Sequence, residues 1–241
     1  MIKKFCAAIT FMTVLPLPCP TLSEKEFGRL TFFFPIVGVT IGIILGLAAW
    51  ALTQFCPPLV TAGILTVLLP CLSGALHLDG LADTADGFLS CRKRERMLEI
   101  MRDSHIGTMG VFAIICELLL KFTVFASLPD WKLPLAAAAA PIAGRCGLIF
   151  YLGISKYARE SGLALMFYKY RPPMLALYGA IILFIASIIL CGSRGLAASC
   201  LVLAFVIIWD AICNAKINGA TGDTLGASSE LSELFFLLAL I

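Results

Sequence analysis

Charged residues are scarce in this chain: they make up 14% of its 241 positions, whereas hydrophobic residues make up 60%. Soluble domains carry about 25% charged residues, so the composition excludes an ordinary soluble fold. No polar stretch is long enough to build a separate domain, and we expect a single domain over residues 1–241. A net charge of +3 is too small to indicate nucleic acid as a partner. The expected partner is a lipid bilayer.

Sequence patterns for a zinc or disulfide site are also missing. The ten cysteines lie mostly in apolar stretches, and no two of them form a C-x-x-C pair or another zinc-ligand spacing. We interpret the cysteines as small packing residues.

Six apolar stretches are long enough to cross a bilayer, which requires roughly 20 residues per helix. The alternating ten-residue segments of a transmembrane barrel are absent, so we predict an all-α polytopic transmembrane helix bundle. The predicted spans are residues 31–53, 59–76, 111–128, 133–154, 174–190 and 196–213. An apolar C-terminal segment, residues 234–241, is too short to cross and is expected to dip into the membrane or pack against the bundle.

The basic residues gather in alternate connections. They are frequent before the first span, in residues 77–110 and in residues 155–173, whereas each of the other three connections holds at most one. The positive-inside rule places the basic connections, and both ends of the six-span bundle, in the cytoplasm. Four charged residues fall within spans and are expected to face the bundle interior or reach a surface: Glu117, Lys121, Arg145 and Asp210.

The segment H-L-D-G-L-A-D-T-A-D-G, residues 77–87, follows the second span on the predicted cytoplasmic side. On a helix, Asp79, Asp83 and Asp86 fall within an arc of roughly 60°. Three carboxylates so close repel one another unless a cation offsets them. A divalent metal site is the favoured interpretation, and a solvated acidic helix face is the alternative.

A second polar segment, residues 101–110, precedes the third span and contains Asp103 and His105. Asp103 is a candidate fourth metal ligand, although an N-cap for the following helix is an equally ordinary use of aspartate. Carboxylate ligands without cysteine favour magnesium, which usually also binds substrate phosphate. His77 and His105 are candidate general bases, and hydrogen-bonded structural histidines are the alternative.

A glycine-rich segment, N-G-A-T-G-D-T-L-G-A-S-S-E-L-S-E, covers residues 218–233. Thr221, Gly222 and Asp223 are candidate substrate-binding residues, because a capped helix start with small residues favours phosphate. A helix-breaking surface turn is the alternative. Glu230 and Glu233 are expected on the same side as the aspartates. Arg145 and Arg159 are the candidate phosphate-binding cations; lipid-headgroup anchoring is the competing use of such residues.

Taken together, H-L-D-G-L-A-D-T-A-D-G, R-D-S-H-I-G-T-M-G and N-G-A-T-G-D-T-L-G-A-S-S-E closely resemble the motifs of the cobalamin synthase family, the adenosylcobinamide-GDP ribazoletransferases. The similarity extends to F-M-T-V-L-P at residues 11–16 and to Tyr157-Ala158-Arg159 followed by Gly162. The resemblance implies transfer of the adenosylcobinamide phosphate group from adenosylcobinamide-GDP to alpha-ribazole, or to its 5'-phosphate, with release of GMP. It also implies a magnesium requirement and a place in the bacterial inner membrane.

The resemblance also suggests a role for each candidate residue in this sequence. Asp79, Asp83, Asp86 and Asp103 are expected to hold magnesium against the diphosphate, with Asp83, Asp86 and Asp103 as the catalytic set. A carboxylate, Asp86 among the candidates, accepts the proton of the ribazole hydroxyl, while Arg145 or Arg159 binds phosphate oxygens. Whether the chain forms a homo-oligomer is left open by the sequence.

Two other functions compete with this interpretation. CDP-alcohol phosphatidyltransferases also use helix-borne aspartates, but their D-G-x-x-A-R pattern is not matched after Asp79 and Gly80. A cation transporter requires acidic residues near the middle of the membrane, where only Glu117 and Asp210 support it.

Overall fold

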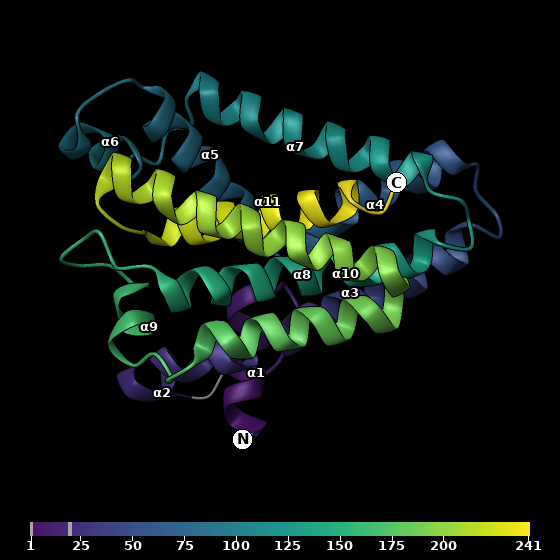
Figure 1. Cartoon of the computed structure of the whole chain (residues 1–241), viewed down its shortest axis with the longest axis horizontal. Helices are drawn as coiled ribbons and strands as arrows, with labels where there is room; N and C mark the ends of the chain where they lie inside the picture. The colour runs from purple at the N-terminus through teal and green to yellow at the C-terminus, as the bar shows by residue number, and fades with distance from the viewer. Residues whose placement is uncertain (1, 19–20) are drawn as a thin grey trace.

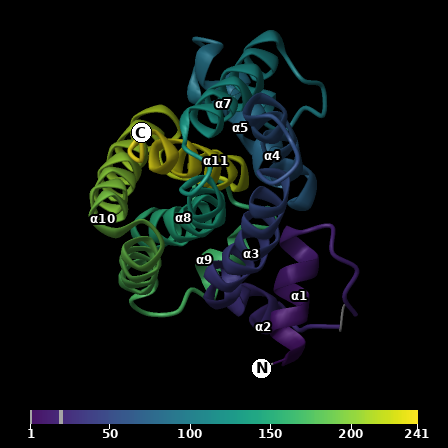
Figure 2. The ribbon, with the colours of Figure 1, turned by 90° about the vertical axis from the view of Figure 1, so that its right-hand side faces the viewer.

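The computed structural model describes residues 2–18 and 21–241, and the part of the chain it describes is helical with no strand. The predicted all-α bundle is therefore confirmed. Figures 1 and 2 show the long helices running side by side along the longest axis of the molecule. In chain order the elements are α1 (Ile2–Met12), α2 (Glu24–Gly28), the 3-10 helix η1 (Arg29–Phe33), α3 (Phe34–Leu52), α4 (Pro58–Leu72), α5 (Leu76–Leu89), α6 (Arg94–Ile100), α7 (Thr108–Ser127), α8 (Leu133–Ile154), α9 (Leu165–Lys169), α10 (Leu175–Ile217) and α11 (Gly222–Leu238).

Four helical stretches in the described residues are long and apolar enough to cross a membrane: Glu24–Leu52, Thr108–Ser127, Leu133–Ile154 and Leu175–Ile217. A fifth is obtained if the bent pair α4 and α5 counts as one span. These helices make the chain a membrane protein. The predicted number of six spans stays a prediction, because it depends on how two bent segments lie in the bilayer.

The first bent segment is α10. Its 43 residues would extend for about 65 Å if straight, roughly twice the hydrocarbon thickness of a bilayer. Instead the chain reverses at Gly192, whose φ of 61° and ψ of −139° lie outside the helical region. Figure 1 shows the two arms of α10 side by side. Each arm corresponds to one predicted span.

The second bent segment is the helix pair that carries the aspartates. The predicted span 59–76 was too long, because α4 ends at Leu72 and α5 leaves it at an angle of 89°. Gly74 and Ala75 both have positive φ values, 59° and 55°, which turn the chain between the two helices. α5 therefore starts beside α11 instead of continuing the direction of α4.

Helix α8 lies at the centre of the bundle and packs against α3, α10 and α11. Small residues allow this close packing: a Cβ atom at Gly38 would lie 2.7 Å from the carbonyl oxygen of Pro141. At Gly42 it would overlap the carbonyl oxygen of Ala138. The alanine-rich stretch 136–140 of α8 therefore forms a close helix contact with α3.

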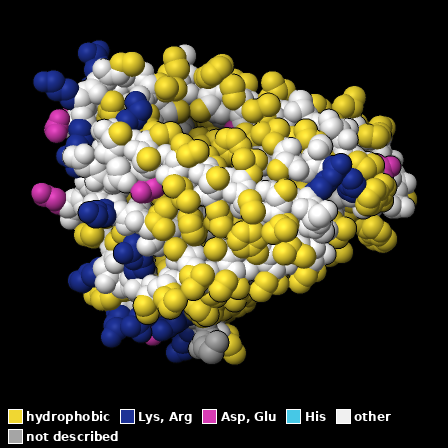
Figure 3. All heavy atoms as spheres, in the orientation of Figure 1, with side chains coloured by type: hydrophobic (Ala, Val, Ile, Leu, Met, Phe, Trp, Pro, Cys, Tyr) yellow, Lys and Arg dark blue, Asp and Glu magenta, His cyan; other side chains and the backbone are white. Residues whose placement is uncertain are grey.

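The polar side chains gather at one end of the bundle. Figure 3 shows most lysine and arginine side chains at the end that Figure 1 labels α6 and α9, and hydrophobic side chains over the middle. Several of the apolar side chains on the outside are well exposed, among them Leu47 at 60% and Phe112 at 61%. This distribution fits a bundle surrounded by lipid with its basic end at one membrane surface.

Helix α11 lies deeper in the bundle than the sequence predicted for Glu230 and Glu233. It runs through the bundle from the basic end, and the carbonyl of Leu240 accepts a hydrogen bond from Arg194, next to the Gly192 turn. Glu230 and Glu233 are consequently buried in the core, so their predicted place beside the aspartates is wrong. The short apolar segment continues this helix and packs against the bundle.

A buried ion network joins α11 to α7 and α8. Lys121 on α7 lies 3.1 Å from Glu117, 2.6 Å from Glu230 and 2.7 Å from Glu233. Arg145 on α8 donates a hydrogen bond to the other oxygen of Glu233. These side chains are at most 5% exposed, so Glu117, Lys121 and Arg145 face the bundle interior, as expected. The network therefore pairs Lys121 and Arg145 with carboxylates of α7 and α11 inside the bundle.

Candidate active site

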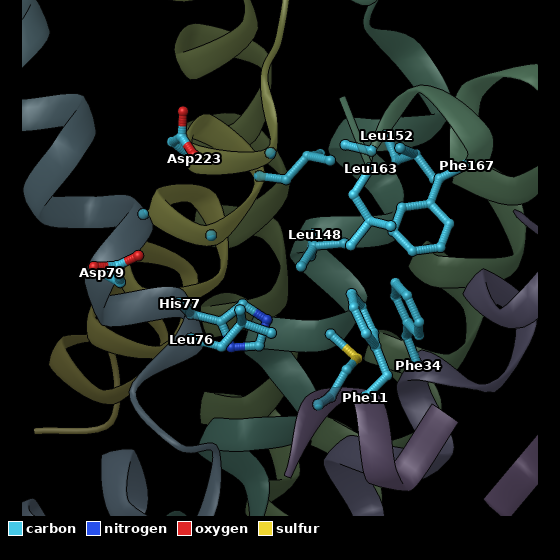
Figure 4. A pocket seen from close by; sticks show the side chains of 16 residues that line it. Phe11, Phe34, Leu76, His77, Asp79, Leu148, Leu152, Leu163, Phe167 and Asp223 are labelled. Carbon is cyan, nitrogen blue, oxygen red and sulfur yellow. The ribbon is translucent and has the colours of Figure 1, made fainter. Parts of the chain in front are cut away.

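The site forms where α5 crosses the start of α11 at the basic end of the bundle. A Cβ atom at Gly80 would lie 2.7 Å from the carbonyl oxygen of Asp223, and one at Gly226 would lie 3.2 Å from the Cα of His77. Glycine at both positions brings the two backbones into contact. The crossing places Asp79 and Asp223 on the rim of one cavity, as Figure 4 shows.

The start of α11 is held in a defined conformation. The Thr221 hydroxyl accepts a hydrogen bond from the amide of Thr224, and the Thr224 hydroxyl accepts one from the amide of Thr221, which together form a capping box. The predicted capped start of a helix in this segment is confirmed, and the capping residue is Thr221. Gly222 lies exposed in the first turn. An uncapped amide in this turn is suited to an anionic group.

Backbone hydrogen bonds attach the segment that carries Arg159 to the start of α11. The amide of Ala220 donates to Lys156 at 2.7 Å, and the amide of Ala158 donates to Ala220 at 2.8 Å. Gly219 makes this approach possible, since its φ is 144° and a Cβ atom there would lie 2.5 Å from the Lys156 carbonyl oxygen. The bridge brings Arg159 to the aspartate end of the molecule.

Arg159 and Asp223 form an ion pair, with 2.9 Å between Nη2 and Oδ2. Burial raises the pKa of Asp223 above its ordinary value, and the neighbouring Arg159 guanidinium acts in the opposite direction. The Nε of Arg159 is buried and has no hydrogen-bond partner in the described part of the chain. The guanidinium therefore has one N–H donor that the ion pair with Asp223 does not use.

The four predicted metal ligands surround two adjacent hollows. Asp79, Asp83 and Asp103 line a hollow of about 240 Å³ together with Arg102. Asp86 and Asp103 line the neighbouring one, of about 160 Å³. The structure thus brings together residues from α5 and from the connection after α6 that are more than fifteen positions apart in sequence.

The carboxylates are not equally free to bind a cation. No residue that the structure describes donates a hydrogen bond to the carboxylate of Asp79 or Asp83, whose oxygens suit a hard cation such as magnesium. Across residues 2–18 and 21–241, however, no three histidine, cysteine or acidic side chains are close enough to hold a metal ion. The magnesium site stays a prediction that requires these side chains to draw together around the ion.

Asp86 has a different role in this conformation. One carboxylate oxygen accepts a hydrogen bond from the amide of Gly107 at 2.7 Å, and the other accepts one from the amide of Gly110 at 2.8 Å. Asp86 therefore caps the first turn of α7 from another helix. The sequence suggested Asp103 for this cap, and that suggestion is wrong because Asp103 bonds to His105 instead.

Asp103 and His105 form an exposed pair. Oδ1 of Asp103 lies 2.6 Å from Nδ1 of His105 and also accepts a hydrogen bond from the His105 amide. These hydrogen bonds lower the pKa of Asp103 below its ordinary value. His105 faces the solvent at the same end as the aspartates, whereas His77 is 2% exposed and lies on the wall of the cavity beside Asp79.

Arg145 lies apart from the residues at the basic end. Its side chain is 1% exposed and is paired with Glu233 inside the bundle. Two of its nitrogens, Nε and Nη2, have no partner among the described residues. The pairing makes Arg145 part of the core network, and its predicted contact with phosphate stays untested.

The sequence of this chain matches a family model over most of its length. The model is described as cobalamin-5-phosphate synthase and covers residues 4–241. The chain belongs to this family. The resemblance seen in the sequence and the prediction of a transferase are confirmed.

Two curated relatives match nearly end to end. A protein of Acetivibrio thermocellus named adenosylcobinamide-GDP ribazoletransferase is 41% identical over 98% of this chain and 96% of its own length. A protein of Citrobacter koseri with the same name is 40% identical over the full length of both chains. No solved structure matches the chain.

Proposed function

We propose that the protein catalyses a magnesium-dependent transfer of the adenosylcobinamide phosphate group from adenosylcobinamide-GDP to alpha-ribazole or its 5'-phosphate. The ribazole 5'-hydroxyl oxygen forms the new bond to phosphorus, the bond to GMP breaks, and GMP leaves. The names of the two full-length relatives support the donor and the acceptor. The structural observation that carries the proposal is the group of free carboxylates, Asp79 and Asp83, directly beside the capped start of α11.

Asp79, Asp83 and Asp103 would hold magnesium, since they line one hollow and present oxygen ligands. Bound magnesium supplies neutralisation of the charge on the diphosphate. Asp86 would join this set only if its carboxylate gave up the hydrogen bonds that it accepts from the amides of Gly107 and Gly110. A carboxylate without a hydrogen-bond partner is better suited than Asp86 to accept the proton of the attacking hydroxyl, and Asp83 would do so through the oxygen that the metal leaves free.

The opposite edge of the site is suited to the phosphate groups. Arg159 carries the positive charge at this edge, and its buried Nε has no hydrogen-bond partner among the described residues. Thr221 and Gly222 start a helix whose first amides favour an anion. Asp223 holds Arg159 in place through the ion pair. These residues would position the donor so that its reacting phosphorus lies between the arginine and the aspartates.

The orientation in the membrane determines which substrates reach the site. We infer that the protein lies in the bacterial inner membrane with its basic end, which carries the aspartates, in the cytoplasm. Nucleotide-activated donor is then available on that side. A homo-oligomer stays a prediction, and the proposed site uses residues of one chain.

The test compares Asp83→Asn with Asp130→Asn, a matched change at an exposed aspartate in the connection between α7 and α8. Each protein is purified in detergent and given magnesium, adenosylcobinamide-GDP and alpha-ribazole, and GMP is measured. We expect turnover of Asp83→Asn to fall by about 10³-fold or more, because the neutral amide lacks the negative charge with which the carboxylate binds the metal ion. Asp130→Asn should keep wild-type turnover. Normal turnover of a folded Asp83→Asn protein would exclude Asp83 as an essential ligand or base.

A further inference from the structure

A cavity of about 180 Å³ opens directly beside Asp79 and Asp223, between α1, α3, α5, α8, α9 and α11. Figure 4 shows that its two ends differ: the carboxylates lie at one end, and Phe11, Phe34 and Phe167 lie at the other. We propose that this cavity binds the base of the acceptor nucleoside, a planar and mostly apolar nitrogen heterocycle. The bound base would hold the attached ribose at the carboxylates. This inference rests on the proposed function, because it assigns one subsite of that reaction.

The aromatic end is built to accept a flat apolar ring. Phe11, Phe34 and Phe167 come from distant parts of the sequence, yet their ring centroids lie 5.5–6.4 Å apart. Leu148 and Leu152 of α8 continue the apolar wall. A phosphate or a sugar would lose its hydrogen bonds to water here without replacement. An aromatic ring gains contact area and edge-to-face contacts with the phenylalanines.

His77 gives the apolar wall one polar position. It lines the cavity, is 2% exposed, and its Nδ1 has no hydrogen-bond partner in the described part of the chain. A buried imidazole nitrogen without a partner is unfavourable, and a ring nitrogen of a bound heterocycle would satisfy it. A lipid acyl chain has no such atom. The pairing of His77 with aromatic walls therefore favours a nitrogen heterocycle over a lipid tail.

The size and entrance of the cavity also agree with this occupant. Pockets that enclose a drug-sized ligand measure about 300–1,000 Å³, so 180 Å³ encloses one ring system and excludes a corrinoid macrocycle. Leu163, which is 54% exposed, and Gly222 lie on its rim. The base can therefore enter from the basic end, while the larger donor remains over the aspartates.

The test measures the KM of each substrate separately in three variants. Leu163→Trp narrows the entrance from an exposed position, and His77→Phe keeps a ring but removes its nitrogens. Leu119→Trp is the matched control, because Leu119 is 57% exposed on α7, away from the cavity. We expect the KM for alpha-ribazole to rise about tenfold in Leu163→Trp, and about three- to tenfold in His77→Phe, which loses one hydrogen bond. The KM for adenosylcobinamide-GDP should stay unchanged, and the control should behave as wild type.

Several outcomes overturn the proposal. An unchanged KM for alpha-ribazole in both variants, or equal increases for both substrates, excludes the cavity as the base subsite. Failure of the proposed function has a different signature, since wild-type protein then gives no product. In that case, equilibrium dialysis of alpha-ribazole decides: binding that Leu163→Trp weakens supports the cavity, and no binding to wild type overturns it. If His77→Phe does not fold, Leu163→Trp alone carries the test.

Discussion

Replacing Lys121 by methionine should destabilise the protein strongly. Lys121 is 1% exposed and is the shared partner of Glu117, Glu230 and Glu233. Methionine fills a similar volume, so the main effect is that three buried carboxylates lose their common cation. Removing one partner of a buried ion pair costs about 3–5 kcal/mol. For a chain of this size, that cost corresponds to a decrease in Tm of roughly 6–20 °C.

The assay is thermal unfolding of the purified protein in one detergent, followed by the loss of the monodisperse peak on size-exclusion chromatography. Lys93→Met is the matched control, because Lys93 is exposed at the basic end and has no ion pair in the described structure. Its Tm should remain within about 2 °C of wild type, as expected for a surface substitution. Adding Glu230→Gln to Lys121→Met should recover part of the loss, since one unpaired charge is removed. A Tm of Lys121→Met equal to that of the control would refute the reasoning.

Three further substitutions test the site. Gly80→Ala should lower turnover, because the added Cβ atom would lie 2.7 Å from the carbonyl oxygen of Asp223 and push α5 away from α11. Gly63→Ala is the control, because the nearest atom to its added Cβ is 3.9 Å away. Equal turnover in the two variants would contradict the importance of this contact. Asp86→Ala should destabilise the protein by about 0.5–2 kcal/mol in thermal unfolding, because it removes the cap of α7; an unchanged Tm would show that this cap contributes nothing. Arg159→Gln should raise the pKa of Asp223 further, because the guanidinium that lowers it is removed. If turnover requires ionised Asp223, the acid limb of the pH profile of kcat/KM should move to higher pH. An unchanged profile would show that turnover does not depend on the ionisation of Asp223.

The parts of the fold set by composition were predictable. Apolar stretches of sufficient length predict the long helices, and the basic connections lie at the same end of the bundle as the aspartates. The bends were not predictable from hydropathy. The turns at Gly74–Ala75 and at Gly192 depend on positive φ values, and nothing in an apolar average distinguishes these positions from their neighbours.

The residue types of the site were also predictable, but their partners were not. Motif spacing identified Asp79, Asp83 and Asp223 as neighbours in function, and the structure places them around adjacent hollows. The aromatic cavity was not predictable, because Phe11, Phe34 and Phe167 come together only through packing of α1, α3 and α9. Glu233 was expected on the same side as the aspartates, but it is buried in the core. Its partners in the core, Lys121 and Arg145, lie on other helices, and a single sequence does not reveal such pairings.

The most direct test of the central claim is product formation by purified wild-type protein. The protein is given adenosylcobinamide-GDP and alpha-ribazole, with magnesium and then with excess chelator, and both products are quantified. The account predicts equal amounts of GMP and of the joined cobalamin product, formed only when both substrates and magnesium are present. Absence of GMP, or GMP released at the same rate without alpha-ribazole, would contradict it.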